Sequence, residues 1–318
     1  TEQDVDRAVR AAHRAFSEGP WASMLPSQRG KLLRNLGDLL ADKSEDLGRT
    51  ECVDTGKMFK ETRWQAKDIA GVFYFYAGLA DKVTGETLPI DKPDMMAMTT
   101  REPLGVIAAV VPWNSQLFLV AVKIGPALAA GNTVVLKASE HASAAMLEFG
   151  RLIEEAGFPP GVVNIVTSAA PEPAAALSGS GNIDMVSFTG STGIGERIYE
   201  SGASTMKRLL LELGGKGAAI VCDDADLKAA IGAIASVWGF HSGQICTAPT
   251  RVIVHKSRVD ELVGGLEKAA GHMRVGDPND PKTIVGPVIS AAQRGRIEGY
   301  IDGGAAQGAT LLIDGRRP

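Results

Sequence analysis

The sequence predicts an α/β protein whose first domain contains a doubly wound parallel sheet. Between residues 105 and 211, apolar runs of β-forming residues alternate with helical segments, which is the order of elements in such sheets. The turns that follow these runs are polar or rich in glycine. Ligands of doubly wound sheets bind at the carboxyl ends of the strands, so these turns are the place to look for chemistry.

The composition excludes several classes of function. The chain has 318 residues, 45 % hydrophobic and 22 % charged, which suits an ordinary soluble globular protein with two domains. Its 33 basic and 37 acidic residues give a formal net charge of −4, so we expect no nucleic acid and no anionic membrane as partner. No apolar run reaches the ~20 residues that a membrane-spanning helix needs.

The cysteines are sparse and lack a CxxC spacing. Cys52, Cys222 and Cys246 therefore predict neither a disulfide framework nor a structural zinc, and we expect no metal. This pattern favours a reducing, cytoplasmic location. Cys52 is expected on or near a helix, without a chemical role. The chain opens at Thr1 rather than methionine, so the location rests on chemistry alone.

The first 80 residues are expected to form packing helices. Residues 1–4 resemble a capping box, and apolar residues follow at helical spacing at Val5, Val9, Ala12 and Phe16. Ser27 is expected to cap a second helix, and residues 61–80 suggest a third.

Residues 83–101 predict a β-hairpin, because two short extended runs flank a turn that contains proline. An exposed, partly apolar hairpin suits subunit pairing. An edge hairpin folded back on its own domain fits the pattern equally well.

The alternating part of the chain defines the predicted sheet. The expected strands are residues 105–111, 133–136, 162–166, 185–188 and 209–211. The expected helices between them include residues 118–130, 142–156 and 195–201.

Two of the turns that follow strands could hold a nucleotide. The turn Gly190–Gly195 joins a strand to a helix, where backbone amides can receive a phosphate, although such a turn is often only a tight connection. Lys137 and Glu140 could hold the hydroxyls of a ribose. Their alternative interpretation is a solvated ion pair at a helix start.

Two other turns could serve catalysis. The Asn114 amide could donate to a developing oxyanion, or it could merely cap the next helix. Glu212 ends an apolar run, and desolvation there would suit it to take a proton from water. Its alternative is an ion pair with Lys207 or Lys216.

Cys246 lies among small residues, after a predicted helix and before the β-rich residues 251–254. A substrate can approach a thiol in such a place, although most free cysteines are inert. A thiol hydrolase would need a histidine partner. His241 is near in sequence, but no Asn or Asp is positioned to orient it, which disfavours a hydrolase.

Taken together, these segments closely resemble the aldehyde dehydrogenase superfamily. The resemblance rests on five motifs in order, Pro112–Asn114, Gly131–Glu140, Phe188–Gly195, Leu211–Lys216 and Gly243–Cys246. The motifs also stand at family-like separations, with 34 residues from Glu212 to Cys246.

The resemblance implies a set of catalytic roles. Cys246 matches the nucleophile that attacks the aldehyde, and Asn114 with the Cys246 backbone amide matches the oxyanion hole. Glu212 matches the base that activates water to hydrolyse the thioester. Lys123 matches a lysine assigned to a proton relay in some members. The implied function is the oxidation of an aldehyde to a carboxylic acid.

The resemblance also implies a Rossmann-like site for NAD. The residues that match it are Pro112, Trp113, Lys137, Ser139, Glu140, Gly190, Ser191, Thr192, Gly195, Leu213 and Gly214. The carboxylate of Glu140 would repel a 2′-phosphate, which favours NAD over NADP. The neighbouring lysine leaves use of NADP possible.

The implied domains are an NAD-binding domain (residues 1–82 and 102–214), an oligomerisation hairpin (83–101) and a catalytic domain (215–318). The hairpin implies a homodimer or homotetramer. The catalytic domain looks incomplete, because a family member would continue for roughly a hundred residues. Ser115 and Gln116 depart from the usual Phe-Pro of the family, and the aldehyde cannot be carried over.

Two alternative functions remain. A dehydrogenase that passes the acyl group to coenzyme A is disfavoured, because such members tend to lack the matching glutamate. A non-catalytic nucleotide-binding or structural protein of the same fold would have no physical need of Asn114, Glu212 and Cys246 together.

Overall fold

The chain divides into two compact units, each of which joins segments that are distant in sequence. The first unit combines Thr1–Leu47 with Gln65–Leu213, and the second combines Gly48–Trp64 with Gly214–Pro318. The computed structural model describes residues 1–316, so the last two residues of the predicted catalytic domain lie outside the described part. Residues 48–64 belong to the second unit, whereas the sequence analysis assigned them to the NAD-binding domain.

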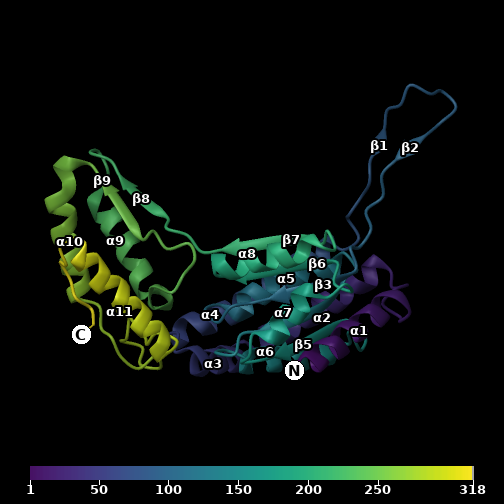
Figure 1. The fold of residues 1–318 in the computed structure, drawn as a ribbon, viewed down its shortest axis with the longest axis horizontal. Coiled ribbons are helices and arrows are strands. Elements are labelled where there is room, and N and C mark those ends of the chain that lie inside the picture. Colours follow the sequence, from purple (N-terminus) through teal and green to yellow (C-terminus); the bar gives the residue numbers. More distant parts are fainter. Residues whose placement is uncertain (317–318) are drawn as a thin grey trace. The chain divides into compact units, whose positions relative to one another are not determined.

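The first unit is built on a five-stranded parallel sheet (Figure 1). In spatial order the strands are β5 (Val163–Thr167), β4 (Thr133–Ala138), β3 (Val106–Val110), β6 (Met185–Gly190) and β7 (Arg208–Leu213). The chain winds outward from β3 in both directions. This arrangement confirms the predicted doubly wound parallel sheet.

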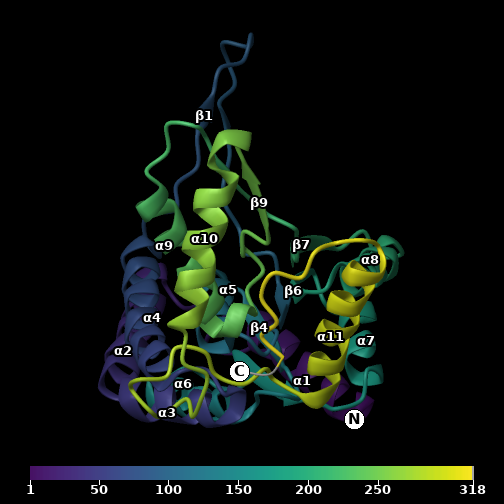
Figure 2. The same ribbon diagram turned by 90° about the vertical axis from the view of Figure 1, so that its left-hand side faces the viewer.

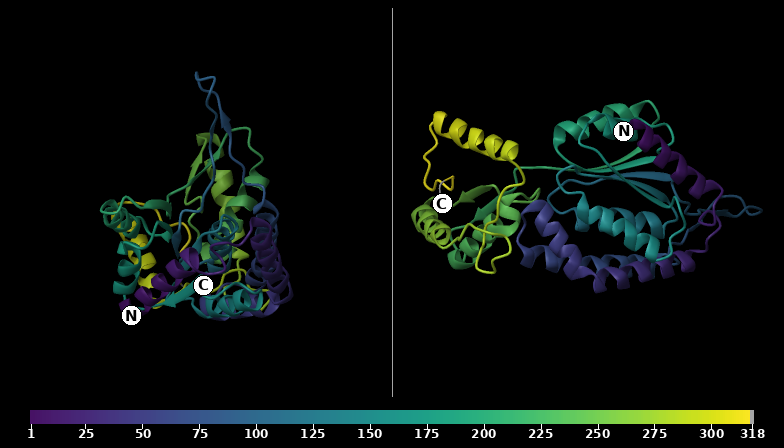
Figure 3. Two further views of the ribbon diagram at one scale, coloured as in Figure 1. Left: turned by 90° about the vertical axis from the view of Figure 1, so that its right-hand side faces the viewer. Right: turned by 90° about the horizontal axis from the view of Figure 1, so that it is seen from below.

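Helices cover both faces of this sheet (Figure 3). One layer contains α1 (Glu2–Ser17), α7 (Glu172–Gly179) and α8 (Thr192–Ala203). The other contains α2 (Pro26–Asp42), α5 (Gln116–Ala129) and α6 (Ala144–Glu155). Two further helices, α3 (Ser44–Thr55) and α4 (Phe59–Leu79), run across the boundaries between the units.

Two apolar clusters occupy the two faces of the sheet. Ile107, Ala109 and Leu136 belong to the cluster that includes α5 and α6, while Ala108 and Val135 belong to the cluster that includes α1. Successive strand residues point to opposite faces, so each central strand needs apolar residues throughout. All six residues of β4 are buried, as expected for a strand between two helical layers.

The helix starts were predicted with mixed success. Thr1 and Asp4 form the expected capping box of α1. Ser27 does not cap α2, which begins at Pro26, because proline already has the φ that a first helical residue requires. The predicted apolar face of α1 was correct at Val5, Val9 and Ala12 but not at its last position. Ala15 is buried there, and Phe16 is only half-buried.

The predicted hairpin is present as β1 (Thr87–Leu88) paired antiparallel with β2 (Ala97–Met98). Each strand has only two residues, and the hairpin extends beyond the sheet of its unit (Figure 1). Several of its apolar side chains are exposed, namely Leu88, Ile90, Met95, Met96 and Met98.

The second unit contains a two-stranded parallel sheet, β8 (Ala218–Val221) and β9 (Arg251–Val254). Its helices are α9 (Leu227–Gly239), α10 (Val259–Gly271) and α11 (Ala291–Ala306), and α9 packs beside α10 (Figure 2). Two short 3-10 segments, η1 (Phe240–Gly243) and η2 (Lys256–Arg258), complete it. Within residues 1–316, no helix combines the length and apolarity required to cross a membrane.

Candidate active site

The strand register brings four predicted turns to one edge of the sheet. Val110 of β3 pairs with Lys137 of β4 and with Phe188 of β6, and Phe188 pairs with Leu211 of β7. The four strands therefore end at nearly the same level. The turns after them share the carboxyl edge of the sheet, where ligands of doubly wound folds bind.

The turn after β3 carries Pro112, Trp113 and Asn114, all half-buried. The N-cap of α5 is Ser115, so Asn114 precedes the cap and does not occupy it. Gln116 follows, and its fully buried side-chain amide has no hydrogen-bond partner within residues 1–316. Ser115 and Gln116, which differ from the Phe-Pro expected by resemblance, therefore directly follow the predicted oxyanion donor.

The turn after β4 holds the predicted ribose contacts. Lys137 Nζ lies 3.2 Å from Glu140 Oε2, with the lysine side chain largely buried. Burial alone would raise the pKa of Glu140, but its own backbone N–H and the Lys137 ammonium outweigh this and lower it. The carboxyl group is therefore ionised at neutral pH. Ser139 is buried, and its hydroxyl accepts a hydrogen bond from the backbone N–H of His141.

The glycine-rich turn connects β6 to α8. Ser191 is the N-cap of α8 and Thr192 its first residue, and the Ser191 side chain makes no capping bond. The backbone N–H groups of Ile194 and Gly195 donate to the Ser191 oxygen, so the amides of Thr192 and Gly193 are the ones that can meet an anion. A Cβ on Gly195 would lie 2.7 Å from Leu213 Cδ2, so a larger residue here would require the Leu213 side chain to shift.

A group of polar side chains lies on the face of the sheet that is covered by α5. The buried Lys123 of α5 donates from Nζ to Ser187 Oγ at 3.0 Å. Ser187 and Thr189 are two residues apart on β6 and share this face. Thr189 is paired with Glu212 in the parallel ladder, which places the Glu212 side chain on the same face. Its negative charge acts on Lys123.

Burial lowers the pKa of Lys123 to about 8, and the charge of Glu212 opposes this shift. An ammonium deprived of water loses solvation, so the neutral amine is favoured. Lys123 is therefore able to exchange a proton near neutral pH, as a relay residue must.

The surroundings of the Glu212 side chain differ from those that the sequence predicted. Its side chain is exposed, whereas the apolar run predicted desolvation. The reason is that β7 is an edge strand. Helix α5 packs over β3 and β4 on this face of the sheet, whereas Arg208, Leu210 and Glu212, which share the face on β7, are exposed. Lys207, one predicted ion-pair partner, instead donates to the backbone oxygens of Ser180 and Ile183.

Cys246 belongs to the second unit, whereas Asn114, Lys123 and Glu212 belong to the first. Its thiol is free and exposed. The backbone N–H of Ala248 bonds to the oxygen of Ile245 at 3.3 Å, so Cys246 occupies the second position of a tight turn. Because the thiol is exposed, an electrophile can reach it.

His241 is not suited to act as a base for this thiol. Its side chain is 2 % exposed. Burial and the Lys57 ammonium lower the pKa of His241 to about 3, and its backbone N–H donates to Glu61 Oε2 at 3.1 Å. The imidazole Nδ1 lies 3.9 Å from Glu61 Oε2, and a buried ring of so low a pKa argues against a Cys–His hydrolase.

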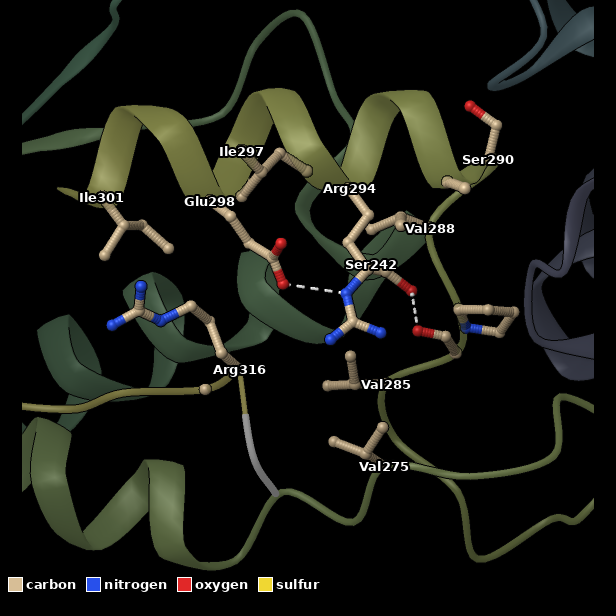
Figure 4. A pocket seen from close by; sticks show the side chains of 14 residues that line it. Ser242, Val275, Val285, Val288, Ser290, Arg294, Ile297, Glu298, Ile301 and Arg316 are labelled. Atoms are coloured by element: carbon tan, nitrogen blue, oxygen red, sulfur yellow. Dashed lines mark hydrogen bonds and ion pairs between the residues drawn. The ribbon is translucent and has the colours of Figure 1, made fainter. Parts of the chain in front are cut away.

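A separate pocket of about 650 Å³ lies in the second unit (Figure 4). Its walls are mostly apolar, with Val275, Val285 and Ile297 among them. Ser242 closes one side by donating to the Gly286 oxygen. Among the described residues, the lining includes none of the predicted site residues, so the pocket carries none of the expected chemistry.

Three residues, Ser187, Glu51 and Lys57, were not identified from the sequence. One pattern pointed to Ser187, because it and Thr189 are polar residues at alternate positions of an otherwise apolar strand. No pattern pointed to Glu51 and Lys57, because charged residues on helices are normally exposed. Within the described part of the chain, no group of three or more His, Cys, Asp or Glu side chains could hold a metal ion.

Comparisons with known proteins agree with the resemblance seen in the motifs. The model of the aldehyde dehydrogenase family matches residues 1–318. A (Z)-2-((N-methylformamido)methylene)-5-hydroxybutyrolactone dehydrogenase of Acinetobacter baylyi is 45 % identical over 98 % of this chain and 64 % of its own length. Betaine aldehyde dehydrogenase of Bacillus subtilis is 39 % identical over 99 % of this chain and 64 % of its own length.

One solved structure has a fold very similar to that of this chain. Betaine aldehyde dehydrogenase of Staphylococcus aureus, in complex with NAD⁺, superimposes with a TM-score of 0.97 at 38 % identity. The match covers 100 % of this chain and 63 % of that one. The chain therefore spans somewhat less than two thirds of the length of these relatives.

Proposed function

The chain belongs to the aldehyde dehydrogenase family, and from this premise we propose that the protein oxidises an aldehyde to a carboxylic acid with NAD as hydride acceptor. The observation that carries the proposal is the common level of the strand ends, which gathers the turns of Asn114, Lys137, Gly190 and Glu212 at one sheet edge.

The proposed chemistry begins at the Cys246 thiolate, which adds to the aldehyde carbon to form a thiohemiacetal. The Asn114 amide and the Cys246 backbone N–H would donate to its oxyanion. NAD, when bound, supplies the hydride acceptor, which leaves a thioester on sulfur. Glu212 would then take a proton from water, and the resulting hydroxide would attack the thioester and release the acid.

Lys123 is the natural destination for that proton. The charge of Glu212 acts on it, its ammonium is hydrogen-bonded to Ser187, and its pKa is lowered to about 8. We propose that protons pass from Glu212 to the Lys123 amine between turnovers.

The residues present fit a dinucleotide. The first amides of α8 can receive a pyrophosphate, and Gly195 lets Leu213 of β7 pack against the first turn of the helix. Lys137 and Glu140 stand at the end of a neighbouring strand, where ribose hydroxyls could replace part of their mutual contact. The ionised Glu140 would repel a 2′-phosphate, so NAD is proposed over NADP.

The test is a rapid-mixing trace of NADH absorbance for the full-length protein with NAD and a panel of aliphatic and aromatic aldehydes. We expect a burst followed by steady turnover. Cys246→Ala should abolish both phases. Glu212→Gln should keep the burst but lose the steady turnover that follows it. Absence of NADH with every aldehyde, from folded protein that binds NAD, would contradict the proposal and favour a binding role. Turnover that depends on added coenzyme A would favour the acylating alternative.

The hairpin supports a proposal about assembly. Its exposed apolar residues include Met96 (75 %) and Met98 (62 %), and such a surface is normally covered. We propose that it pairs with a second copy to form a homodimer or homotetramer. Sedimentation should show smaller species for Met96→Lys with Met98→Lys, and unchanged assembly would contradict this role.

We also propose a reducing compartment, in agreement with the three free cysteines of the chain. Cys246 must remain a thiol to act.

A further inference from the structure

The segment that leads to Cys246 contains an unusual backbone turn. His241, Ser242 and Gly243 are consecutive residues with positive φ, at 49°, 55° and 75°. Glycine adopts this left-handed conformation freely, but residues with a Cβ enter it at a cost. A non-glycine pair in this region persists only where surrounding contacts hold it.

Three hydrogen bonds hold this turn, and two of them join it to distant segments. The carboxylate of Glu61, in the first turn of α4, accepts the backbone N–H of His241 at 3.1 Å. Ser242 Oγ donates to the backbone oxygen of Gly286 at 2.9 Å. Gln244 Nε2 donates to the backbone oxygen of His241 at 3.0 Å. Every residue named here belongs to the second unit.

Glu61 is itself fixed in place. Its side chain is 11 % exposed, and Lys57 and Lys60 act on its charge. Lys57 is held in turn by Glu51 at 2.7 Å. Burial raises the pKa of Glu61, while the His241 N–H and the two lysines oppose the rise. Because the imidazole of His241 is neutral, the bond that matters is the one from the backbone N–H to the carboxylate.

The held turn connects directly to the nucleophile. The backbone N–H of Gln244 bonds to the oxygen of His241 at 3.1 Å, and that of Ile245 bonds to the oxygen of Gly243 at 3.0 Å. The turn from Ile245 to Ala248, which carries Cys246, begins at the next residue. A shift at His241 therefore passes along the hydrogen-bonded backbone to the thiol.

We infer that Glu61 is a positioning residue that fixes the left-handed turn at His241 and Ser242, and so sets the direction in which Cys246 meets the aldehyde. The inference rests on the proposed function, because it assumes that Cys246 is the nucleophile. Glu61 itself touches neither the thiol nor the substrate in this scheme.

The test compares Glu61→Ala with Glu61→Gln in the full-length protein. Glutamine keeps an oxygen that can accept the His241 N–H, and alanine removes it. We expect Glu61→Ala to lower the rate of the NADH burst at saturating aldehyde by about tenfold or more, since small misplacements of reacting groups are costly. The Kd for NAD should stay unchanged. Glu61→Gln should restore most of the burst, and Glu267→Ala, at an exposed glutamate on α10, is the matched control.

Hydrogen–deuterium exchange gives a readout that needs no turnover. In Glu61→Ala the peptide covering residues 240–248 should exchange faster, while α10 exchanges as in the wild type. Wild-type exchange in that peptide, an unchanged burst, or a failure of Glu61→Gln to restore it would overturn the inference. Because exchange is measured without aldehyde, it decides the matter even if the wild type forms no NADH.

Discussion

Lys123 Nζ donates to Ser187 Oγ at 3.0 Å across the packing of α5 on the sheet. A buried ammonium needs such a partner, because an unsatisfied charged donor carries the full cost of its desolvation. Ser187→Ala is therefore expected to lower the free energy of unfolding by about 1–3 kcal/mol near pH 6.5. Chemical denaturation measures this. Ser204→Ala, at an exposed serine, is the control, and an equal effect in both variants would contradict the assignment.

The burial of Lys123 also predicts a pH dependence of stability. Its pKa falls from 10.5 to about 8 on folding, so between these values the unfolded chain binds more protons than the folded one. The cost of holding the charged amine is complete below pH 8, at roughly 3 kcal/mol. It fades as the pH rises to 10.5. Lys123→Met should thus be more stable than the wild type at pH 7, and the gain should shrink by pH 10. A constant difference across this range would contradict the lowered pKa.

The same lysine predicts a pH dependence of turnover. If the neutral amine receives protons from Glu212, thioester hydrolysis should rise with pH and level off above about 8. Lys123→Met should lose this inflection. Lys123→Arg should lose it as well, because a guanidinium does not titrate in this range. Steady-state rates from pH 6 to 10 are the measurement, and an inflection that survives in both variants would belong to another group.

Glu51 and Lys57 form a buried ion pair of 2.7 Å in the second unit, with side chains 0 % and 2 % exposed. Burial raises the pKa of Glu51 and lowers that of Lys57, and each charge opposes the shift of the other. Either Glu51→Gln or Lys57→Met should cost about 3–5 kcal/mol, because the buried charge that remains loses its hydrogen-bonded partner of opposite charge.

The double variant should cost much less than the sum of the two. A double-mutant cycle by chemical denaturation measures the difference. The Arg294–Glu298 pair, 2.9 Å apart with side chains 63 % and 35 % exposed, is the matched comparison and should couple by less than about 1 kcal/mol. Equal coupling in the two cycles would show that burial does not decide the strength of these pairs.

Much of the fold was predictable because its pattern is local. The runs that became the central strands β3 and β4 are largely apolar and almost wholly buried, as strands covered on both faces must be. Helix α3 was not identified as an element, since most of its residues are polar and Glu51 is buried only through contacts made in the folded unit. Helix α7 was missed because it is only eight residues long and has a proline at its start.

In the candidate site too, the features set by local pattern were predictable and those set by long-range contacts were not. The turns after the strands were predictable, because residues that follow parallel strands must share an edge. The exposure of Glu212 was not, since an edge strand and a central strand can have the same apolar sequence. The bonds of Ser187 to Lys123 and of Glu61 to His241 join residues 64 and 180 positions apart, and no periodicity in the sequence records such pairs.

The split composition of the second unit has a consequence for synthesis on the ribosome. Residues 48–64 are made early, yet they pack with residues that follow Leu213. At about 5–20 residues per second, Glu61 waits on the order of ten seconds or longer for His241, which is made 180 residues later. During this interval the early segment lacks its native partners, while the first unit has time to complete its sheet. The turn that carries Cys246 can therefore form only late in the synthesis of the chain.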